Sequence, residues 1–328
     1  MRYQRKQNER GVALVTVLMI VAAMSTVAVM LSSAVLSSTN RARALDAGAQ
    51  ADWFATGAEQ FAGTALEELL SATGAALFAD MPLLTQPISF NVEGGRLALT
   101  VEDASNCFNL NTLSNARHDG EEVTAQSPST DFLNLLEYAE LEGIDSERLA
   151  SALIDWMDPD QAPGLGGAED SYYRSLTPPY RTAGQPFANL TELYAVRHVT
   201  PELVDKLRPL VCVHETVGFN ALNINTLTEA EAPMLALAMS GALRVDTARD
   251  VIFQRPPGGW ESVGEMMELP EMAQVAPDRR RMDMLSVNSS HIGVTAVIEY
   301  RGLRRTYEIL YALDKSGGVH AVRKERKG

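Results

Sequence analysis

The chain has 328 residues, of which 46% are apolar, and its 42 acidic and 28 basic side chains give a net charge of −14. A general nucleic-acid binder needs a basic face for phosphate contacts, so this charge argues against one. The apolar fraction suffices for one large core or two smaller ones and excludes a disordered chain.

The N-terminus carries the strongest signal. Four basic residues, Arg2, Arg5, Lys6 and Arg10, precede an uncharged run over 11–40 whose apolar part covers 12–36. Because about 20 apolar residues cross a bilayer, this run predicts a membrane span. The basic residues place the N-terminus in the cytoplasm and the bulk of the chain outside it, in the periplasm of a diderm bacterium. A secretory signal would have a shorter apolar core, of about 7–15 residues.

The helical pattern continues beyond the span. Apolar residues recur every three or four positions from Ala51 to Leu69, and the first proline after the span is Pro82. This spacing predicts one helix from about Val12 to about Phe78, about 100 Å long. A plain anchor followed by a separate helix fits the same periodicity.

Two pairs of alternating segments predict β-hairpins, one over 88–92 and 96–101 and the other over 293–300 and 304–313. Residues 109–285, between them, have a helical pattern. The expected fold is therefore α+β: a long N-terminal transmembrane helix packed on a small antiparallel sheet, with a large inserted all-α domain.

The insertion contains an internal repeat. The segment from Asn109 to Leu113 returns at 223–227, and the segment that begins at Phe187 returns at Trp260. Asparagines bond local backbone where a chain enters a helix, so we interpret the repeat as structural. The second copy, with helices expected at 229–240 and 245–254, also resembles a helix-hairpin-helix module, which can hold DNA phosphates. The acidity of the insertion's first half argues against that use.

Five carboxylates lie in one bent loop that is rich in proline and glycine: Asp155, Asp158, Asp160, Glu169 and Asp170. Clustered carboxylate oxygens suit Ca²⁺, which accepts a flexible geometry, better than Mg²⁺. The candidate ligands are Asp158, Asp160, Glu169 and Asp170, with Asp155 as a weaker one. The alternative is a solvated acidic loop.

Since the sequence holds no paired zinc histidines, nucleophile elbow or phosphate loop, we do not expect an enzyme.

Several of these motifs carry a resemblance. The junction of Gly11 and Val12, after a basic leader, resembles the class III leader of type IV pilins and pseudopilins. In most of that superfamily the fifth mature residue is a glutamate that pairs with the N-terminal amine of the neighbouring subunit nearer the tip, but here it is Thr16. With the segments 155–160 and 166–173, the chain is similar over nearly its whole length to the minor pseudopilin K family of type II secretion.

The resemblance implies a structural subunit that caps the tip of the pseudopilus and helps to initiate or control its assembly for export of folded proteins. It implies Ca²⁺ in the insertion, cleavage by prepilin peptidase after Gly11, and an inner-membrane location before assembly. The implied partners are minor pseudopilins I and J, then H and the major pseudopilin G, with no nucleic acid or small-molecule substrate. A DNA-handling minor pseudopilin of a competence system is the alternative.

The expected segments are a leader (1–11), the transmembrane part of the helix (12–36), its periplasmic part with the first hairpin (37–108), the inserted helical domain with its two copies (109–285), the last strands of the pilin domain (286–314) and a basic tail (315–328). Export to an oxidising compartment makes a disulfide between Cys107 and Cys212 possible, because both cysteines lie near the entry to a repeat copy. Two buried free thiols are the alternative.

Overall fold

The computed structural model describes residues 3–73, 76–115, 127–141, 143–216, 218–314 and 318–327. A single helix, α1 (Tyr3–Thr73), contains both the apolar run and the amphipathic segment that follows it. The expectation of one continuous helix is therefore confirmed against an anchor with a separate helix. The helix ends five residues earlier than expected, because the following segment makes tertiary contacts: Ala76 pairs with Asn288, and Leu77 is fully buried.

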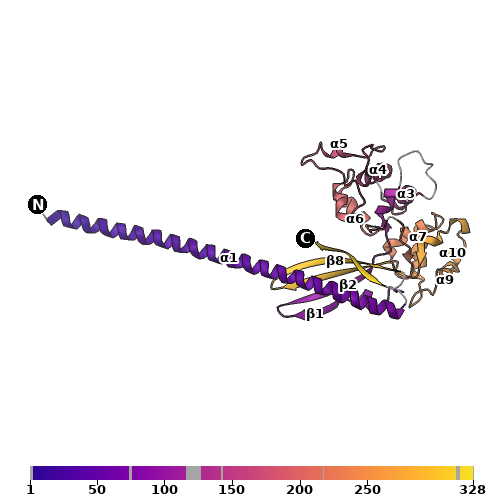
Figure 1. Cartoon of the computed structure of the whole chain (residues 1–328), viewed down its shortest axis with the longest axis horizontal. Helices are drawn as coiled ribbons and strands as arrows, with labels where there is room; N and C mark the ends of the chain where they lie inside the picture. The colour runs from indigo at the N-terminus through magenta and orange to yellow at the C-terminus, as the bar shows by residue number, and fades with distance from the viewer. Residues whose placement is uncertain are drawn as a thin grey trace.

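A five-stranded antiparallel sheet packs against the second half of α1 (Figure 1), in the order β1-β2-β7-β8-β9. Alternating residues of β2, among them Leu99 and Val101, meet small residues of α1 such as Ala51 and Ala55 in one buried core. The small side chains let the helix approach the sheet closely. The strands are β1 (Ile88–Val92), β2 (Gly95–Asp103), β7 (His291–Tyr300), β8 (Leu303–Leu313) and β9 (Val319–Lys327), and a short helix, α2 (Pro82–Thr85), precedes β1.

The expectation of a basic tail over 315–328 is wrong. Residues Val319–Lys327 form β9, which pairs antiparallel with β8 at the edge of the sheet. Charged side chains suit an exposed edge strand, and here they are matched by acids: Lys327 lies 2.8 Å from Glu308 and Lys324 lies 2.5 Å from Glu59. The basic residues that suggested a tail belong to an edge strand.

The insertion between β2 and β7 has its own core and lies at the end of the sheet away from the N-terminal half of α1 (Figure 1). It is mainly helical but not all-α, because two short parallel ladders, β3-β4 and β5-β6, begin and close its two halves. Its elements are α3 (Pro128–Tyr138), α4 (Ser146–Met157), α5 (Asp170–Tyr173), α6 (Pro201–Leu207), α7 (Ala232–Ala238), α8 (Val245–Phe253), α9 (Val263–Met267), α10 (Pro270–Ala273), β3 (Phe108–Asn109), β4 (Val211–Cys212), β5 (Leu222–Asn223) and β6 (Leu285–Ser286).

The repeat has the same hydrogen bonds in both copies. The side-chain amide of Asn111 donates to the carbonyl of Phe187 (3.0 Å) and accepts from its N–H (2.8 Å). In the second copy, Asn225 donates to the carbonyl of Trp260 (2.9 Å) and accepts from its N–H (2.8 Å). The paired asparagines thus join distant segments of the insertion, which agrees with a structural role for the motif.

Candidate functional site

Three carboxylates of the acidic loop gather at the C-terminal end of α4. Asp155 lies in the last turn of α4, Asp158 is the residue that caps it, and Glu169 precedes α5. One oxygen from each lies within 4.8 Å of the others. Asp155 is fully buried and Glu169 is 2% exposed. Three of the five candidate ligands predicted from the sequence thus lie together, including Asp155, which the sequence favours least.

The loop is folded tightly onto Asp155. The N–H of Gly164 donates to both carboxylate oxygens of Asp155, at 3.1 and 3.2 Å. A side chain at Gly167 would place its Cβ 1.9 Å from an Asp155 oxygen, so only glycine fits there. Arg197 and His198 hold the loop from outside through the carbonyls of Gly167 and Gly166, each at 2.9 Å. Sequence reasoning missed these two residues, because nothing in the local pattern links them to a loop thirty residues earlier.

The electrostatics of the cluster disfavour three negative charges. Burial, with the neighbouring charges of Asp158, Asp155 and others, raises the pKa of Glu169 to about 8. Among the described residues, Glu169 Oε1 is buried without a hydrogen-bond partner. A divalent cation would offset this repulsion and give that oxygen a partner. The donor set is all oxygen and therefore fits Ca²⁺, with further ligands from backbone carbonyls or water.

Two other candidate ligands lie outside this group. Asp160 is exposed, and its Oδ1 accepts from the N–H of Ala162 at 2.7 Å. Asp170 turns to Arg174, whose Nη2 lies 2.6 Å from its Oδ2, and to the N–H of Thr182 at 3.1 Å. Arg174, four residues along the chain, forms an ion pair with Asp170, whose carboxylate lies outside the group formed by Asp155, Asp158 and Glu169.

Aromatic rings order the base of the loop. The ring centroids of Trp156 and Tyr173 lie 5.3 Å apart, and those of Tyr173 and Tyr180 lie 5.2 Å apart. Burial raises the pKa of Tyr173 to about 12, so its hydroxyl stays protonated and accepts from the N–H of Arg197. A buried aromatic base of this kind does not suit the alternative of a solvated acidic loop.

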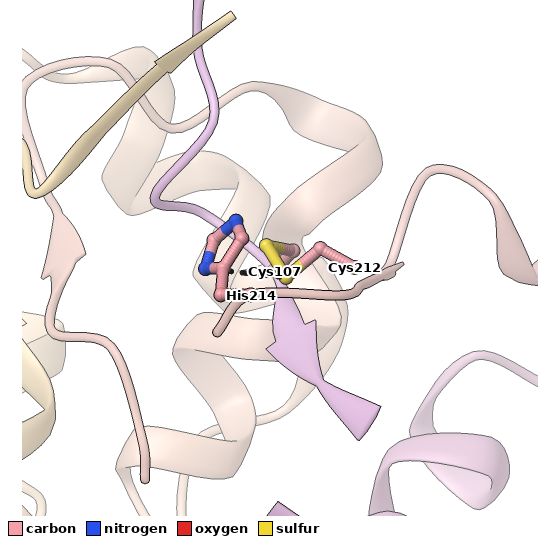
Figure 2. A group of neighbouring side chains, drawn as sticks. All are labelled: Cys107, Cys212 and His214. Atoms are coloured by element: carbon pink, nitrogen blue, oxygen red, sulfur yellow. Dashed lines mark hydrogen bonds between the residues drawn. A yellow bond between two sulfur atoms is a disulfide. The ribbon is translucent and has the colours of Figure 1, made fainter. Parts of the chain in front are cut away.

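A disulfide joins Cys107, beside β3, to Cys212 of β4, with a Cα–Cα distance of 5.7 Å. His214 lies beside it, its Nδ1 3.9 Å from the Cys212 sulfur (Figure 2). Since both sulfurs are bonded to each other, neither offers a thiolate to a metal, and this trio is not a metal site. In the chain-entropy model, a crosslink that closes about 100 residues stabilises the fold by about 4.7 kcal/mol.

The N-terminal half of α1 is apolar and exposed. It contains the one candidate membrane span in the described residues, with a mean hydropathy of 2.6 in its most apolar window. Residues such as Leu18 and Met30, 60% and 70% exposed, would otherwise face water. The Thr16 hydroxyl donates to the carbonyl of Val12 at 2.8 Å, within its own helix. Gly11 and Val12 both lie inside α1.

Residues 106–216 and 222–288 match the family described as type II secretion system protein K. The protein K of Aeromonas hydrophila is 31% identical over 98% of both chains. That of Klebsiella pneumoniae is 32% identical over 98% of this chain and 97% of the relative, and that of Pectobacterium carotovorum is 33% identical over 79% of each.

The fold is similar to that of a solved structure. One match is the crystal structure of the GspK-GspI-GspJ complex of enterotoxigenic Escherichia coli, with a TM-score of 0.75 at 26% identity over 88% of this chain and 99% of that chain. The pilin-like arrangement of helix, sheet and insertion described above is thus shared with a solved type II secretion complex. The sequence and structural matches together show that the chain belongs to the type II secretion system protein K family, the minor pseudopilins of that machinery.

Proposed function

We propose that this minor pseudopilin caps the tip of the pseudopilus and helps to initiate or control its assembly for export of folded proteins across the outer membrane. The observation that carries the proposal is the place of the insertion. It lies toward the end of the sheet away from the membrane-spanning half of α1 (Figure 1). We propose that it occupies the place that the next subunit of a stack would take. A filament can accommodate such a mass once, at its end.

Thr16 supports the same position. A carboxylate inside a bilayer is costly unless it has a partner, and a subunit with nothing above it has no neighbouring amine to offer one. The hydroxyl of Thr16 needs no such neighbour, because it bonds the backbone of its own helix. The chain is therefore suited to lie in the membrane, and later at the top of the filament, without a neighbouring subunit above it.

The partners we propose are minor pseudopilins I and J, then H and the major pseudopilin G. The solved relative from Escherichia coli is a complex with I and J, and the fold shared with it supports the same association here. We propose that Ca²⁺ binds Asp155, Asp158 and Glu169 and fixes the acidic loop against α4. The loop would then present one fixed conformation to a partner subunit or to the secretin, the pore of the secretion system in the outer membrane.

Co-purification tests this proposal. The full chain, expressed with its own I and J subunits, should form a stoichiometric complex in the presence of calcium. A chelator should weaken it if the acidic loop lies at an interface and leave it intact if the loop faces away. Failure to form any complex at micromolar concentrations would argue against the proposed partners.

We further propose that prepilin peptidase cleaves between Gly11 and Val12 and that the bulk of the chain is periplasmic. The basic leader before a continuous apolar helix supports both. Gly11→Leu should leave the longer precursor in the inner membrane, whereas Ser37→Ala, beyond the leader, should be processed normally. Intact-mass measurement checks this, and a wild-type chain that retains residues 1–11 would contradict it.

A further inference from the structure

We propose that the membrane-facing end of the pilin domain binds the headgroups of anionic phospholipids. The residues that would bind them are Arg41, Arg43, Arg96, Arg301 and Arg304, here called the arginine cluster. All five are exposed, and the two from β8 and its preceding turn have side chains that are 61% and 70% exposed. The inference rests on the membrane span of α1 and not on a position in the filament.

The height of the cluster above the bilayer follows from the helix. The apolar run ends at Leu36, and each residue of α1 adds about 1.5 Å. Arg41 and Arg43 therefore lie about 7.5 and 10.5 Å beyond the hydrocarbon edge. A headgroup region is about 5–8 Å deep on each side of the hydrocarbon core, and arginine side chains reach along an interface to place their charge there. Both guanidinium groups can thus meet lipid phosphates.

Two hairpin turns bring the other arginines to the same height. The turn between β7 and β8, at Arg301 and Gly302, lies beside Asn40 and Arg43 of α1 across a hollow of about 560 Å³. A second hollow of about 460 Å³ joins that turn to the β1-β2 turn and to Arg96. Figure 1 shows both turns directed toward the N-terminal half of α1. The cluster is therefore a surface of the folded domain and not of the helix alone.

Within the described residues, only two of the five arginines in the cluster form ion pairs. Arg301 pairs with Asp46 at 3.1 Å, and Arg304 lies 3.9 Å from Glu299. Within the described residues, Arg41 and Arg43 form no ion pair, and Arg96 bonds only the hydroxyl of Ser89. A chain with a net charge of −14 thus turns a basic surface toward the membrane. Such surfaces attract anionic headgroups, and the guanidinium fork binds phosphate through two parallel hydrogen bonds.

Native mass spectrometry of the full chain in detergent tests the proposal with two probes, dioleoyl phosphatidylglycerol and dioleoyl phosphatidylethanolamine. The wild type should bind phosphatidylglycerol roughly tenfold more tightly than phosphatidylethanolamine, as expected for two or more arginines near an anionic headgroup. Arg41→Gln with Arg43→Gln, and separately Arg301→Asn with Arg304→Gln, should each reduce the preference severalfold. Changing the first pair to lysine should retain most of it.

A matched control uses Arg244→Gln with Arg249→Gln, which removes the same charge from exposed residues of the insertion. That variant should keep the preference for phosphatidylglycerol. The basic residues before position 11 are the same in every variant, so their contribution cancels. Equal loss in the control, or no loss in either double variant, would overturn the proposal. Displacement of the lipid by inorganic phosphate would overturn it too, by assigning the cluster to a free anion.

Discussion

At the scale of single residues, the acidic loop depends on where each carboxylate lies and not on how many there are. Asp155 and Glu169 are buried on the inner side of the loop, whereas Asp160 is exposed. Sequence reasoning found the loop, because carboxylates and bend-forming residues are local features. It could not separate the inner from the outer carboxylates, because that depends on how α4 and the loop pack together. The ion pair of Asp170 with Arg174 could have been predicted from the sequence, because the two residues are four positions apart.

We predict that calcium changes how the stability of the chain depends on pH. The pKa of Glu169, ordinarily about 4.5, is raised to about 8 in the folded chain without a cation. The folded state therefore holds a proton that the unfolded state has lost in this range, and stability should fall as the pH rises from about 5 to about 8. Melting temperatures measured in chelator should decrease accordingly, and millimolar calcium should remove most of the decrease.

The matched variants are Glu169→Gln and Glu147→Gln, the second an exposed residue in the first turn of α4. Glu169→Gln should lose both the pH dependence and the calcium response. Glu147→Gln should keep both, with about 2.7 kcal/mol of added stability when calcium is 100-fold above its dissociation constant. A wild type whose melting temperature is the same in chelator and in calcium would exclude the site.

At the scale of elements, the long segments were predictable and the short ones were not. The helix α1 and the hairpins β1-β2 and β7-β8 have a hydrophobic period over many residues, and their existence and type follow from it. The ladders β3-β4 and β5-β6 have two residues per strand, too few to show any period. The sequence did not predict β9, because a charged edge strand and a basic tail have the same composition.

The repeat allows a paired prediction about the insertion. Asn111 and Asn225 are buried, at 1% and 0% exposure, and each satisfies both backbone groups of an aromatic residue in its own copy. Alanine at either position leaves buried donors and acceptors without partners, at a cost of about 1–3 kcal/mol for each group. Asn111→Ala and Asn225→Ala should therefore both destabilise the chain, by roughly 2–4 kcal/mol.

Chemical denaturation of the full chain measures this effect. Asn134→Ala is the control, because that residue is a half-buried asparagine of α3 outside the repeat motif. It should cost less than about 1 kcal/mol. A loss in only one of the two repeat variants would mean that the copies are not equivalent in energy, despite their matching hydrogen bonds.

At the scale of the whole molecule, the two cores are joined by polar contacts that hold the insertion on the sheet. The carboxylate of Asp103, at the end of β2, accepts from Asn223 at 3.1 Å and from Thr226 at 2.6 Å. Arg323 of β9 donates to the carbonyl of Val213 at 2.8 Å. Bonds between the sheet and both halves of the insertion orient it relative to α1. The mass that we propose would block a further subunit is therefore fixed at one end of the pilin domain.

The tip position has a direct test in Thr16. We propose that two features restrict the chain to the end of the filament: the missing membrane carboxylate and the bulk of the insertion. Restoring the carboxylate alone should therefore not allow the chain to assemble at positions along the filament. Thr16→Glu should remain a single terminal subunit or assemble poorly, because the insertion still blocks addition above it. Quantitative immunoblots of sheared filaments should show no rise in the ratio of this subunit to the major pseudopilin, and a rise would mean that the insertion does not limit stacking.

The most direct measurement is immunogold labelling of pseudopili assembled with the wild-type chain bearing an epitope in the insertion. The account predicts gold at one end of each filament, and one copy of the chain per filament irrespective of filament length. Gold distributed along the filaments, or a copy number that increases with their length, would contradict the assignment to the tip.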